Sequence, residues 1–367
     1  MEILQFGLSE NLGGIETYLK KIYDSIDKSN FHFSFIDMTG ENGHPALEDE
    51  FKKRGCTFYK ICPRRVSVIQ NWKELERLFT EHHFDVLHFN INTLSYFAPI
   101  LIALKHGCKV VVHSHNTSNV GSKITKLLHI LNRLFLSMLR VERIACSTPA
   151  GKWLFGKKAF IFSPNGVDTD IFRFSFEKRN NIRKTLNCED KLVIGQVAAF
   201  IPVKNQAFTI EIFEQIKMIV PNAVMWFIGQ GETMEQIKTL VHEKHLDDSV
   251  LFLGRRTDMP DLYCGMDAHI LPSLYEGFPN VAMEAQAMGL PCLFSDCITK
   301  EIKMFESLDF MSLSETPEAW ADKLLKMINT ANIDRVNACK RIEEKGMSVK
   351  QEILRIEKLY AGIIEGR

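Results

Sequence analysis

Short hydrophobic runs of strand length alternate along this chain with longer stretches of helical periodicity. In the first half, strands are expected at residues 3–8, 31–38, 86–89, 109–113 and 143–147. In the second half, strands are expected at residues 191–197, 223–228, 250–253 and 268–271. Hydrophobic strands separated by helices are typical of a parallel sheet that is covered by helices on both faces. The pattern therefore predicts an α/β fold made of doubly wound sheets.

A turn-rich segment over residues 163–172 divides the two halves, because it breaks the alternation of strands and helices. A chain of 367 residues is long enough for two domains with separate cores. We therefore expect one domain over residues 1–170 and a second over residues 171–345. Residues 346–367 are expected to form a C-terminal helix.

Charge and cysteine content disfavour several classes of protein. The 45 basic and 45 acidic residues cancel, so nothing in the overall charge indicates a nucleic-acid partner. The nine cysteines include no Cys-x-x-Cys pair, which disfavours a disulfide framework and a zinc site. The first residues do not resemble a signal peptide, and no hydrophobic run reaches the roughly twenty residues of a membrane span. We therefore expect a cytoplasmic protein, in solution or attached to the inner face of the membrane.

The most informative segment covers residues 271–289. A strand is followed by a loop that contains Glu276, and Pro279 is expected as the first residue of a helix that contains Glu284. Such a unit forms a crevice at the carboxyl end of a parallel sheet, where the N–H groups of the helix start favour a phosphate. With Glu276 and Glu284 accepting hydrogen bonds from hydroxyl groups on either side, the segment predicts a nucleotide-sugar site. The alternative is that each carboxylate only interacts with the helix dipole.

The sequence Glu276-Gly277-Phe278-Pro279, with Glu284 eight positions after Glu276, resembles the signature of family 4 glycosyltransferases. The resemblance implies the GT-B architecture, in which two doubly wound domains face each other across a cleft. It also implies a retaining enzyme that moves a sugar from a nucleotide diphosphate sugar to a saccharide or lipid-linked acceptor. The chain looks most similar to bacterial exopolysaccharide and capsule glycosyltransferases. In that family the first domain is on the acceptor side, the second binds the nucleotide sugar, and the last helix returns to the first domain.

The resemblance also implies roles for individual residues. The catalytic residues would be Glu276, His115 and Lys204, with Lys204 neutralising the leaving phosphate and the other two orienting the donor sugar. The nucleotide-sugar-binding residues would include Gly14, Gly277, Phe278, Pro279, Asn280 and Glu284. Glu284 would hold the ribose. No cofactor other than the nucleotide sugar as co-substrate is expected.

Two glycine motifs follow expected strands. Gly13 and Gly14 can bring the chain close to a ligand, or they can form a plain strand-to-helix turn. Glu16 is expected to cap the helix that follows. Gly229 and Gly231 are not followed by the third glycine of a dinucleotide fingerprint, since position 234 is Met, which disfavours nicotinamide chemistry. Their segment either lines the nucleotide side of the cleft, as in the family, or only turns the chain.

The cations around the expected phosphate depart from the family pattern. Ala198 and Ala199 occupy the positions where the family usually carries Gly-Arg, whereas Lys204 is retained. An Arg–phosphate contact contributes about 1.5–3 kcal/mol, so its absence would weaken catalysis unless another cation replaces it. Gly254, Arg255 and Arg256 close another strand, and either arginine is a candidate for contacting the base or a phosphate, although a solvated arginine is the commoner case.

Two pairs of residues could suggest a metal ion. His113 and His115 would share one face if their strand continued, but we expect the strand to end at His113, which packs, while His115 faces the cleft. Asp168 and Asp170 form an Asp-x-Asp motif within the interdomain segment. Each pair supplies only two ligands, which is too few for a complete site, so no metal is expected.

Residues 105–143 are strongly basic, with seven bases against the single acid Glu142. Hydrophobic residues fill the gaps between these bases: Leu127, Leu128, Ile130, Leu131, Leu134, Phe135, Leu136 and Leu139. This composition is compatible with a basic helix that lies on an anionic membrane carrying a lipid-linked acceptor. The sequence alone favours the alternative, a core helix with a solvated rim.

Two other functions remain open. A nucleotide-sugar epimerase of similar architecture would use the same donor pocket without an acceptor, and its product would be an epimer of the donor. A scaffold protein without catalytic activity would explain the missing arginine. Such a protein would, however, be expected to have lost Glu276, Glu284 and Lys204 as well.

Overall fold

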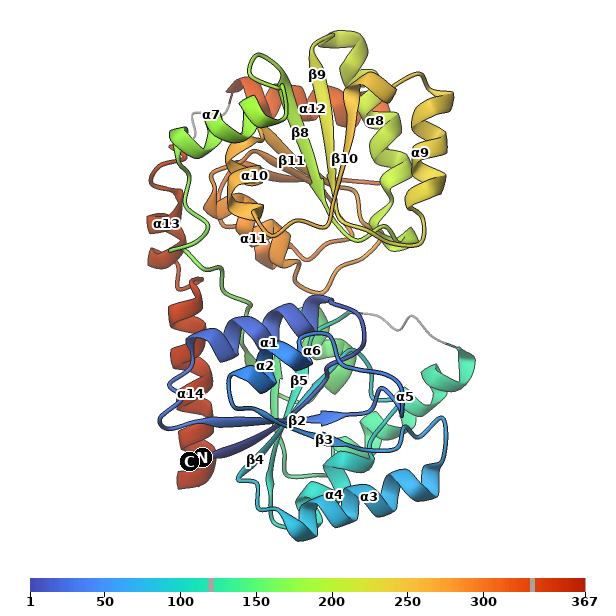
Figure 1. Cartoon of the computed structure of the whole chain (residues 1–367), viewed down its shortest axis with the longest axis vertical. Coiled ribbons are helices and arrows are strands. Elements are labelled where there is room, and N and C mark those ends of the chain that lie inside the picture. Colours follow the sequence, from blue (N-terminus) through green and yellow to red (C-terminus); the bar gives the residue numbers. More distant parts are fainter. Residues whose placement is uncertain (118–121, 331–333, 367) are drawn as a thin grey trace. The chain divides into compact units, whose positions relative to one another are not determined.

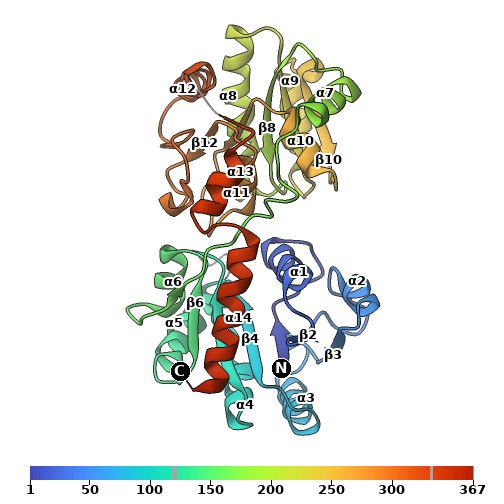
Figure 2. The same cartoon turned by 90° about the vertical axis from the view of Figure 1, so that its left-hand side faces the viewer.

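The computed structural model describes residues 1–117, 122–330 and 334–366. The chain forms two compact α/β units (Figures 1 and 2). The first unit contains Met1–Asn165 together with Val349–Arg367, and the second contains Gly166–Ser348. The chain thus leaves the first unit after Asn165, slightly before the expected position near residue 170, and its C-terminal helix belongs to the first unit.

The first unit is built on a seven-stranded parallel sheet with the order β3-β2-β1-β4-β5-β6-β7. Its strands are β1 Glu2–Phe6, β2 His32–Asp37, β3 Thr57–Lys60, β4 Val86–Ile91, β5 Lys109–Ser114, β6 Glu142–Ala145 and β7 Ile161–Phe162. Its helices are α1 Gly14–Ser25, α2 Glu48–Lys53, α3 Val68–Glu81, α4 Ala98–Lys105, α5 Lys123–Leu136, α6 Thr148–Phe155 and α14 Val349–Glu365. The five strands expected in this half are all present.

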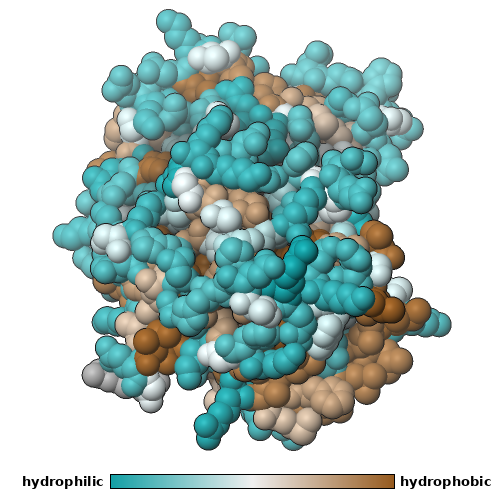
Figure 3. Space-filling view, turned by 60° about the horizontal axis from the view of Figure 1, so that its bottom comes forward, coloured by the Kyte–Doolittle hydropathy of each residue, from teal (hydrophilic) through white to brown (hydrophobic). Residues whose placement is uncertain are grey.

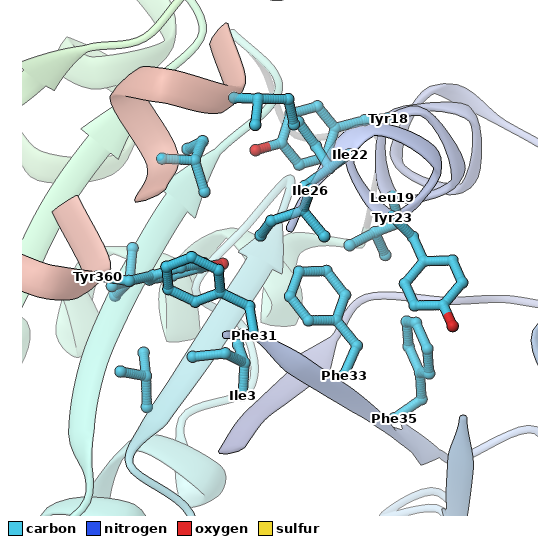
Figure 4. Close-up of a cluster of buried hydrophobic side chains, with 14 of the residues drawn as sticks. Ile3, Tyr18, Leu19, Ile22, Tyr23, Ile26, Phe31, Phe33, Phe35 and Tyr360 are labelled. Atoms are coloured by element: carbon cyan, nitrogen blue, oxygen red, sulfur yellow. The ribbon is translucent and has the colours of Figure 1, made fainter. Parts of the chain in front are cut away.

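Aromatic and aliphatic side chains of α1, α14 and the sheet share one core in the first unit (Figure 4). Tyr360 of α14 is fully buried, and its ring lies 5.8 Å from that of Phe31. Ile22 of α1 and Ile3 of β1 belong to the same cluster. Burying the apolar face of α14 fixes the C-terminal helix to this unit, because apolar burial is the main favourable term in packing.

The second unit contains a six-stranded parallel sheet with the order β10-β9-β8-β11-β12-β13. Its strands are β8 Leu192–Val197, β9 Ala223–Ile228, β10 Val250–Gly254, β11 Ala268–Leu271, β12 Cys292–Ser295 and β13 Leu308–Met311. Its α-helices are α7 Phe176–Thr185, α8 Gln206–Ile219, α9 Met234–Glu243, α10 Met259–Gly265, α11 Asn280–Ala287, α12 Pro317–Thr330 and α13 Ala338–Glu344. Three short 3₁₀ helices complete it: η1 Pro202–Lys204, η2 Asp247–Ser249 and η3 Lys300–Ile302.

Both sheets reverse their strand order once, between β1 and β4 in the first unit and between β8 and β11 in the second. The loops that follow two such strands diverge to opposite faces of the sheet, which leaves a crevice at their carboxyl ends. Ligands of open α/β sheets bind in this crevice. The segments after β8 and β11 contain Lys204 and Glu276, so the topology places both at the switch point of the second sheet.

Two further observations concern expectations from the sequence. All nine cysteines are free. Among the residues that the structure describes, no helix has the length and hydrophobicity needed to cross a membrane.

Candidate functional site

The crevice of the second sheet holds an ion pair between Lys204 and Glu276. Lys204 ends the 3₁₀ helix η1 after β8, and Glu276 lies in the loop after β11. The exposed fraction of the two side chains is 20% and 11%, so the pair is largely shielded from water. The Ser273 hydroxyl donates a second hydrogen bond to the same Glu276 carboxylate oxygen at 2.9 Å. A cation and an anion are therefore held side by side at the point where a ligand would enter.

Backbone contacts fix the two loops against each other. The Leu274 N–H donates to the Val203 carbonyl at 2.8 Å, and the Asn205 side-chain amide donates to the Pro272 carbonyl at 3.2 Å. From within β8, the buried Gln196 side chain donates to the Lys204 carbonyl at 2.8 Å. Because these bonds restrain both loops, the ion pair is positioned before any ligand binds.

The loop after β11 leads directly into α11. Gly277, Phe278 and Pro279 are buried, and Asn280 is the first helical residue. Pro279 is the N-cap, not the first helical residue as expected, because its ψ of 118° is extended. A proline side chain cannot accept a hydrogen bond, so no side-chain cap covers the helix start. The positive end of the α11 dipole therefore lies at the loop that contains Glu276, the ion-pair partner of Lys204.

Glu284 lies one turn further along α11 and has a specific partner. The buried Tyr263 hydroxyl of α10 donates to its Oε2 at 2.9 Å. Burial, followed by the nearby Glu284 carboxylate, raises the pKa of Tyr263 well above its usual range. The tyrosine therefore remains a donor at physiological pH and fixes the orientation of the Glu284 carboxylate.

The glycines after β9 are required by packing. A Cβ at Gly229 would lie 2.0 Å from the Ala198 carbonyl oxygen, and one at Gly231 would lie 2.3 Å from that of Phe200. These two glycines let the loop after β9 pack on the backbone of the loop after β8. This favours the turn interpretation of the Gly-Gln-Gly motif over a ligand-binding one.

Three cations are candidates to replace the arginine that the family resemblance implies at position 199, and they differ in whether they already form an ion pair. Ala199 is exposed, so its position is open to solvent. Arg256 makes a bidentate pair with Asp258, and Lys303 is paired with a glutamate three positions later. Arg255 follows the β10 residue Gly254, is exposed, and has no hydrogen bond or ion pair within the described part of the chain. Arg255 is thus the cation of this group that remains available.

The first unit carries Gly14 and His115, each after a strand near the switch point. Glu16 caps α1, as expected, because its Oε2 accepts from the Gly13 N–H at 2.9 Å. A Cβ added at Gly14 would meet no described atom within 4 Å. Packing within the unit thus gives no reason for glycine at position 14, whereas close approach of a ligand would.

Asn90 determines the tautomer of His115. The Asn90 amide nitrogen donates to the Gln5 side-chain oxygen and to the Phe6 carbonyl, each at 3.0 Å. Its Oδ1 therefore faces His115 Nε2, 3.0 Å away, and accepts a hydrogen bond from the N–H at that position. Burial lowers the pKa of His115 to about 3, so the ring is neutral at physiological pH. His115 Nδ1 is left as an acceptor, which suits a sugar hydroxyl.

A row of histidines lies beneath His115. β5 continues to Ser114, one residue beyond the expected end, and the ring centroids of His113 and His115 are 3.9 Å apart. His113 is fully buried, and its Nδ1 lies 3.2 Å from Nε2 of His88, whose Nδ1 lies 2.5 Å from the Tyr360 hydroxyl. Within the described ranges, no group of three or more His, Cys, Asp or Glu side chains is arranged to hold a metal ion.

Asp168 has a structural role in the Asp-x-Asp motif. Its Oδ1 accepts from the N–H groups of Asp170 and Ile171, at 3.0 and 3.1 Å. This side-chain-to-backbone arrangement stabilises a turn where the chain enters the second unit.

The sequence interpretation did not identify Asn90, Tyr263 or Ser273, which orient His115, Glu284 and Glu276. For Asn90 a signal existed, because His88 and Asn90 alternate at the carboxyl end of an otherwise hydrophobic strand. Tyr263 had none, since its partner is set by the packing of α10 on α11, whereas Ser273 lies only three positions before Glu276 in the same loop.

Comparison with known proteins indicates the family of the chain. Residues 12–171 match the model of Glycosyltransferase Family 4, and residues 177–348 match that of Glycosyl transferases group 1. EpsF of Bacillus subtilis is 28% identical over 362 residues, which cover 95% of this chain and 94% of EpsF. The Escherichia coli UDP-Gal:alpha-D-GlcNAc-diphosphoundecaprenol alpha-1,3-galactosyltransferase is 25% identical, with 99% of this chain and 97% of that enzyme covered.

Solved structures show the same fold. HepE from Anabaena, in complex with UDP and glucose, superposes with a TM-score of 0.80 at 18% identity over 99% of this chain and 100% of HepE. WaaG, a glycosyltransferase involved in lipopolysaccharide biosynthesis, superposes with a TM-score of 0.74 at 13% identity over 99% of this chain and 100% of WaaG. The expected GT-B fold is confirmed. With family models matched across both units, the chain belongs to glycosyltransferase family 4.

Proposed function

We propose that this enzyme transfers a sugar from a nucleotide diphosphate sugar to a hydroxyl of a saccharide or lipid-linked acceptor in exopolysaccharide biosynthesis, with retention of the anomeric configuration. The names of its relatives support this class of reaction: the Escherichia coli enzyme uses UDP-Gal and a diphosphoundecaprenol-linked acceptor, and HepE binds UDP and glucose. The comparisons give no support to the epimerase alternative.

The observation that carries the proposal is the Lys204–Glu276 pair at the switch point of the second sheet. In the reaction, the bond between the anomeric carbon and the diphosphate oxygen breaks, and its electron pair leaves with the diphosphate. A new bond forms to the acceptor oxygen, whose proton is released. Lys204 and the start of α11 stabilise the charge that develops on the diphosphate, and stabilisation of this kind is commonly the largest catalytic contribution.

Other residues orient the donor. Glu284, oriented by Tyr263, accepts hydrogen bonds from the ribose hydroxyls. Glu276 and the neutral His115 accept hydrogen bonds from the sugar. Gly277, Phe278, Pro279 and Asn280 shape the diphosphate loop, Gly14 allows close approach of the chain, and Gly254 and Arg255 contact the nucleotide.

We propose in addition that transfer requires no divalent cation. Lys204 and the α11 dipole supply positive charge where the leaving group develops negative charge. The Asp168 carboxylate, the most metal-like feature of the sequence, already accepts two backbone hydrogen bonds.

We also place the enzyme in the cytoplasm, acting at the inner face of the membrane. This location follows from the proposed lipid-linked acceptor, because the diphosphate and sugar of such an acceptor lie at the bilayer surface.

Product analysis tests the proposed function. The protein is incubated with UDP- and GDP-sugars, the donors named for its relatives, in the presence of lipid-linked and soluble saccharide acceptors. Mass spectrometry is expected to detect a glycoside heavier than the acceptor by one sugar residue, and NMR of its anomeric proton to show retention. An epimer of the donor as the sole product would refute the proposal. Failure of every nucleotide sugar to raise the melting temperature would favour the scaffold interpretation.

A further inference from the structure

Helix α5 packs on the first unit through the polar side chains of His129 and Asn132 and through the buried Leu136. Its buried His129 accepts at Nδ1 from the Leu94 N–H, at 3.1 Å, and its Nε2 lies 3.3 Å from the Trp153 carbonyl. Asn132, one turn further, donates to the Leu94 carbonyl at 2.6 Å. The His129 ring also stacks on Trp153, with 4.1 Å between ring centroids. Hydrogen bonds to the backbone therefore hold the inner face of this helix.

The outer face of α5 is hydrophobic, which is the reverse of an ordinary surface helix. Its apolar residues recur at helical spacing and are about half exposed or more: Ile124 70%, Leu127 57%, Ile130 49%, Leu131 44%, Leu134 60% and Phe135 55%, followed by Met138 at 72%. Figure 3 shows hydrophobic side chains gathered on the side of the first unit that carries α5 in Figure 1. The alternative of a core helix with a solvated rim is therefore wrong.

Positive charge flanks this hydrophobic face. α5 contains no acidic residue, and Lys123 and Lys126 are exposed. An open hollow of about 440 Å³ lies beside the helix and is lined by Arg133, Lys157 and Lys158 together with Leu134, Ser137, Phe155 and Gly156. Its lining thus combines apolar side chains with three cationic residues, and the cations suit a phosphate group.

We propose that α5 docks the enzyme on an anionic phospholipid bilayer, with its hydrophobic face in the interfacial region and a lipid phosphate in the hollow between Arg133, Lys157 and Lys158. This inference rests on the proposed function, since a lipid-linked acceptor is presented by such a surface. A hydrophobic helix face bordered by lysine and arginine is the pattern of helices that lie in a membrane interface. A second copy of this chain fits less well, because it would bring the same positive charges together.

Vesicle binding tests the proposal without donor or acceptor, so that its outcome is independent of catalysis. The full chain is floated with vesicles of phosphatidylcholine alone or mixed with phosphatidylglycerol. Binding is expected with the anionic vesicles and should weaken as salt is added. A protein that stays in solution with both kinds of vesicle refutes the proposal, even if it glycosylates a soluble acceptor; failure of that transfer would count against the proposed function alone.

Two sets of variants locate the contact. The double variant Leu127→Asp with Leu134→Asp should reduce the partition coefficient on anionic vesicles at least about tenfold, because two inserted side chains become charged. The matched control is Met218→Asp with Ile219→Asp, at residues of the second unit that are 67% and 56% exposed, and it should bind like the wild type. All four changed residues are exposed, so the cores are left intact.

The hollow is tested separately. Lys157→Ala with Lys158→Ala should weaken binding to anionic vesicles by about fivefold for each base removed, while leaving the weak binding to phosphatidylcholine unchanged. Wild-type binding by both the aspartate and the lysine variants would refute the proposal. So would sedimentation data in which the wild type dimerises and the Leu127 and Leu134 variant is monomeric, because the α5 face would then be an interface between copies of the chain.

Discussion

Replacing Lys204 with alanine tests the centre of the proposed mechanism. The ammonium group is held by Glu276 in a crevice where the side chains are 20% and 11% exposed. Low exposure limits screening by water, so one positive charge has a larger effect there than on the surface. Ala199 supplies no second charge at the position where the resemblance to the family implies an arginine. We therefore expect Lys204 to provide most of the side-chain charge that stabilises the leaving diphosphate.

The size of the effect follows from the strength of a charge-assisted hydrogen bond. Such a contact contributes about 1.5–3 kcal/mol, which corresponds to a loss of roughly tenfold to 150-fold in kcat/KM. Charge on the leaving oxygen grows towards the transition state, so most of the loss should be in kcat and less in KM.

The assay compares initial rates of glycoside formation by the wild type and the variant. Lys244→Ala serves as the matched control, because Lys244 and Glu214 form a 2.6 Å ion pair of similar exposure in the same unit, between α9 and α8. Thermal melts of both variants separate loss of folded protein from loss of catalysis. If Lys204→Ala remains folded and transfers sugar at the wild-type rate, the assignment of Lys204 to the leaving group is wrong.

Four further outcomes are expected. Glu284→Ala should raise the dissociation constant of free nucleotide diphosphate in calorimetry, because the ribose loses charge-assisted hydrogen bonds; an unchanged constant in a folded variant would remove Glu284 from the site. Transfer should survive excess chelator, and activity that is lost with chelator and restored by magnesium or manganese would contradict the proposal. Ala199→Arg should raise the transfer rate by roughly tenfold if about 1.4 kcal/mol of transition-state stabilisation is recovered; an unaltered rate would indicate that Arg255 already supplies the charge. Burial lowers the pKa of His88 and His115 to about 3 in the folded protein, below the unfolded value near 6.5. Between these two pH values the folded state binds fewer protons than the unfolded state, so the free energy of unfolding should fall as the pH is lowered from about 6.5 towards 3. Melting temperatures measured from pH 7 to pH 4 check this, and a constant melting temperature would show that the two rings are not buried as neutral groups.

The local features of this protein were determined by sequence alone. Alternating hydrophobic runs predicted parallel sheets because a strand buried on both faces must be hydrophobic along its whole length. The segment from Glu276 to Glu284 predicted a loop and a helix start, which the structure contains, with the helix beginning at Asn280. These inferences depend on residues close in sequence, for which periodicity and turn chemistry are sufficient.

Contacts between distant segments were decided by the tertiary structure. Lys204 and Glu276 are 72 positions apart and form a pair because β8 and β11 are neighbours at the switch point of their sheet. Asn90 reaches His115 in the same way, through the pairing of β4 with β5. Strand order depends on the packing of the whole unit, which local periodicity does not contain.

Helix α5 shows that local periodicity also does not determine which face of a helix is exposed to solvent. Helical spacing in the sequence indicates that Leu127, Leu131 and Leu134 share one face, and it favoured burial of that face in a core. The structure instead turns this face outward and holds the helix through His129 and Asn132. Periodicity specifies which residues lie together on a helix, whereas the direction of that face is set by the hydrogen bonds and packing that the rest of the fold offers.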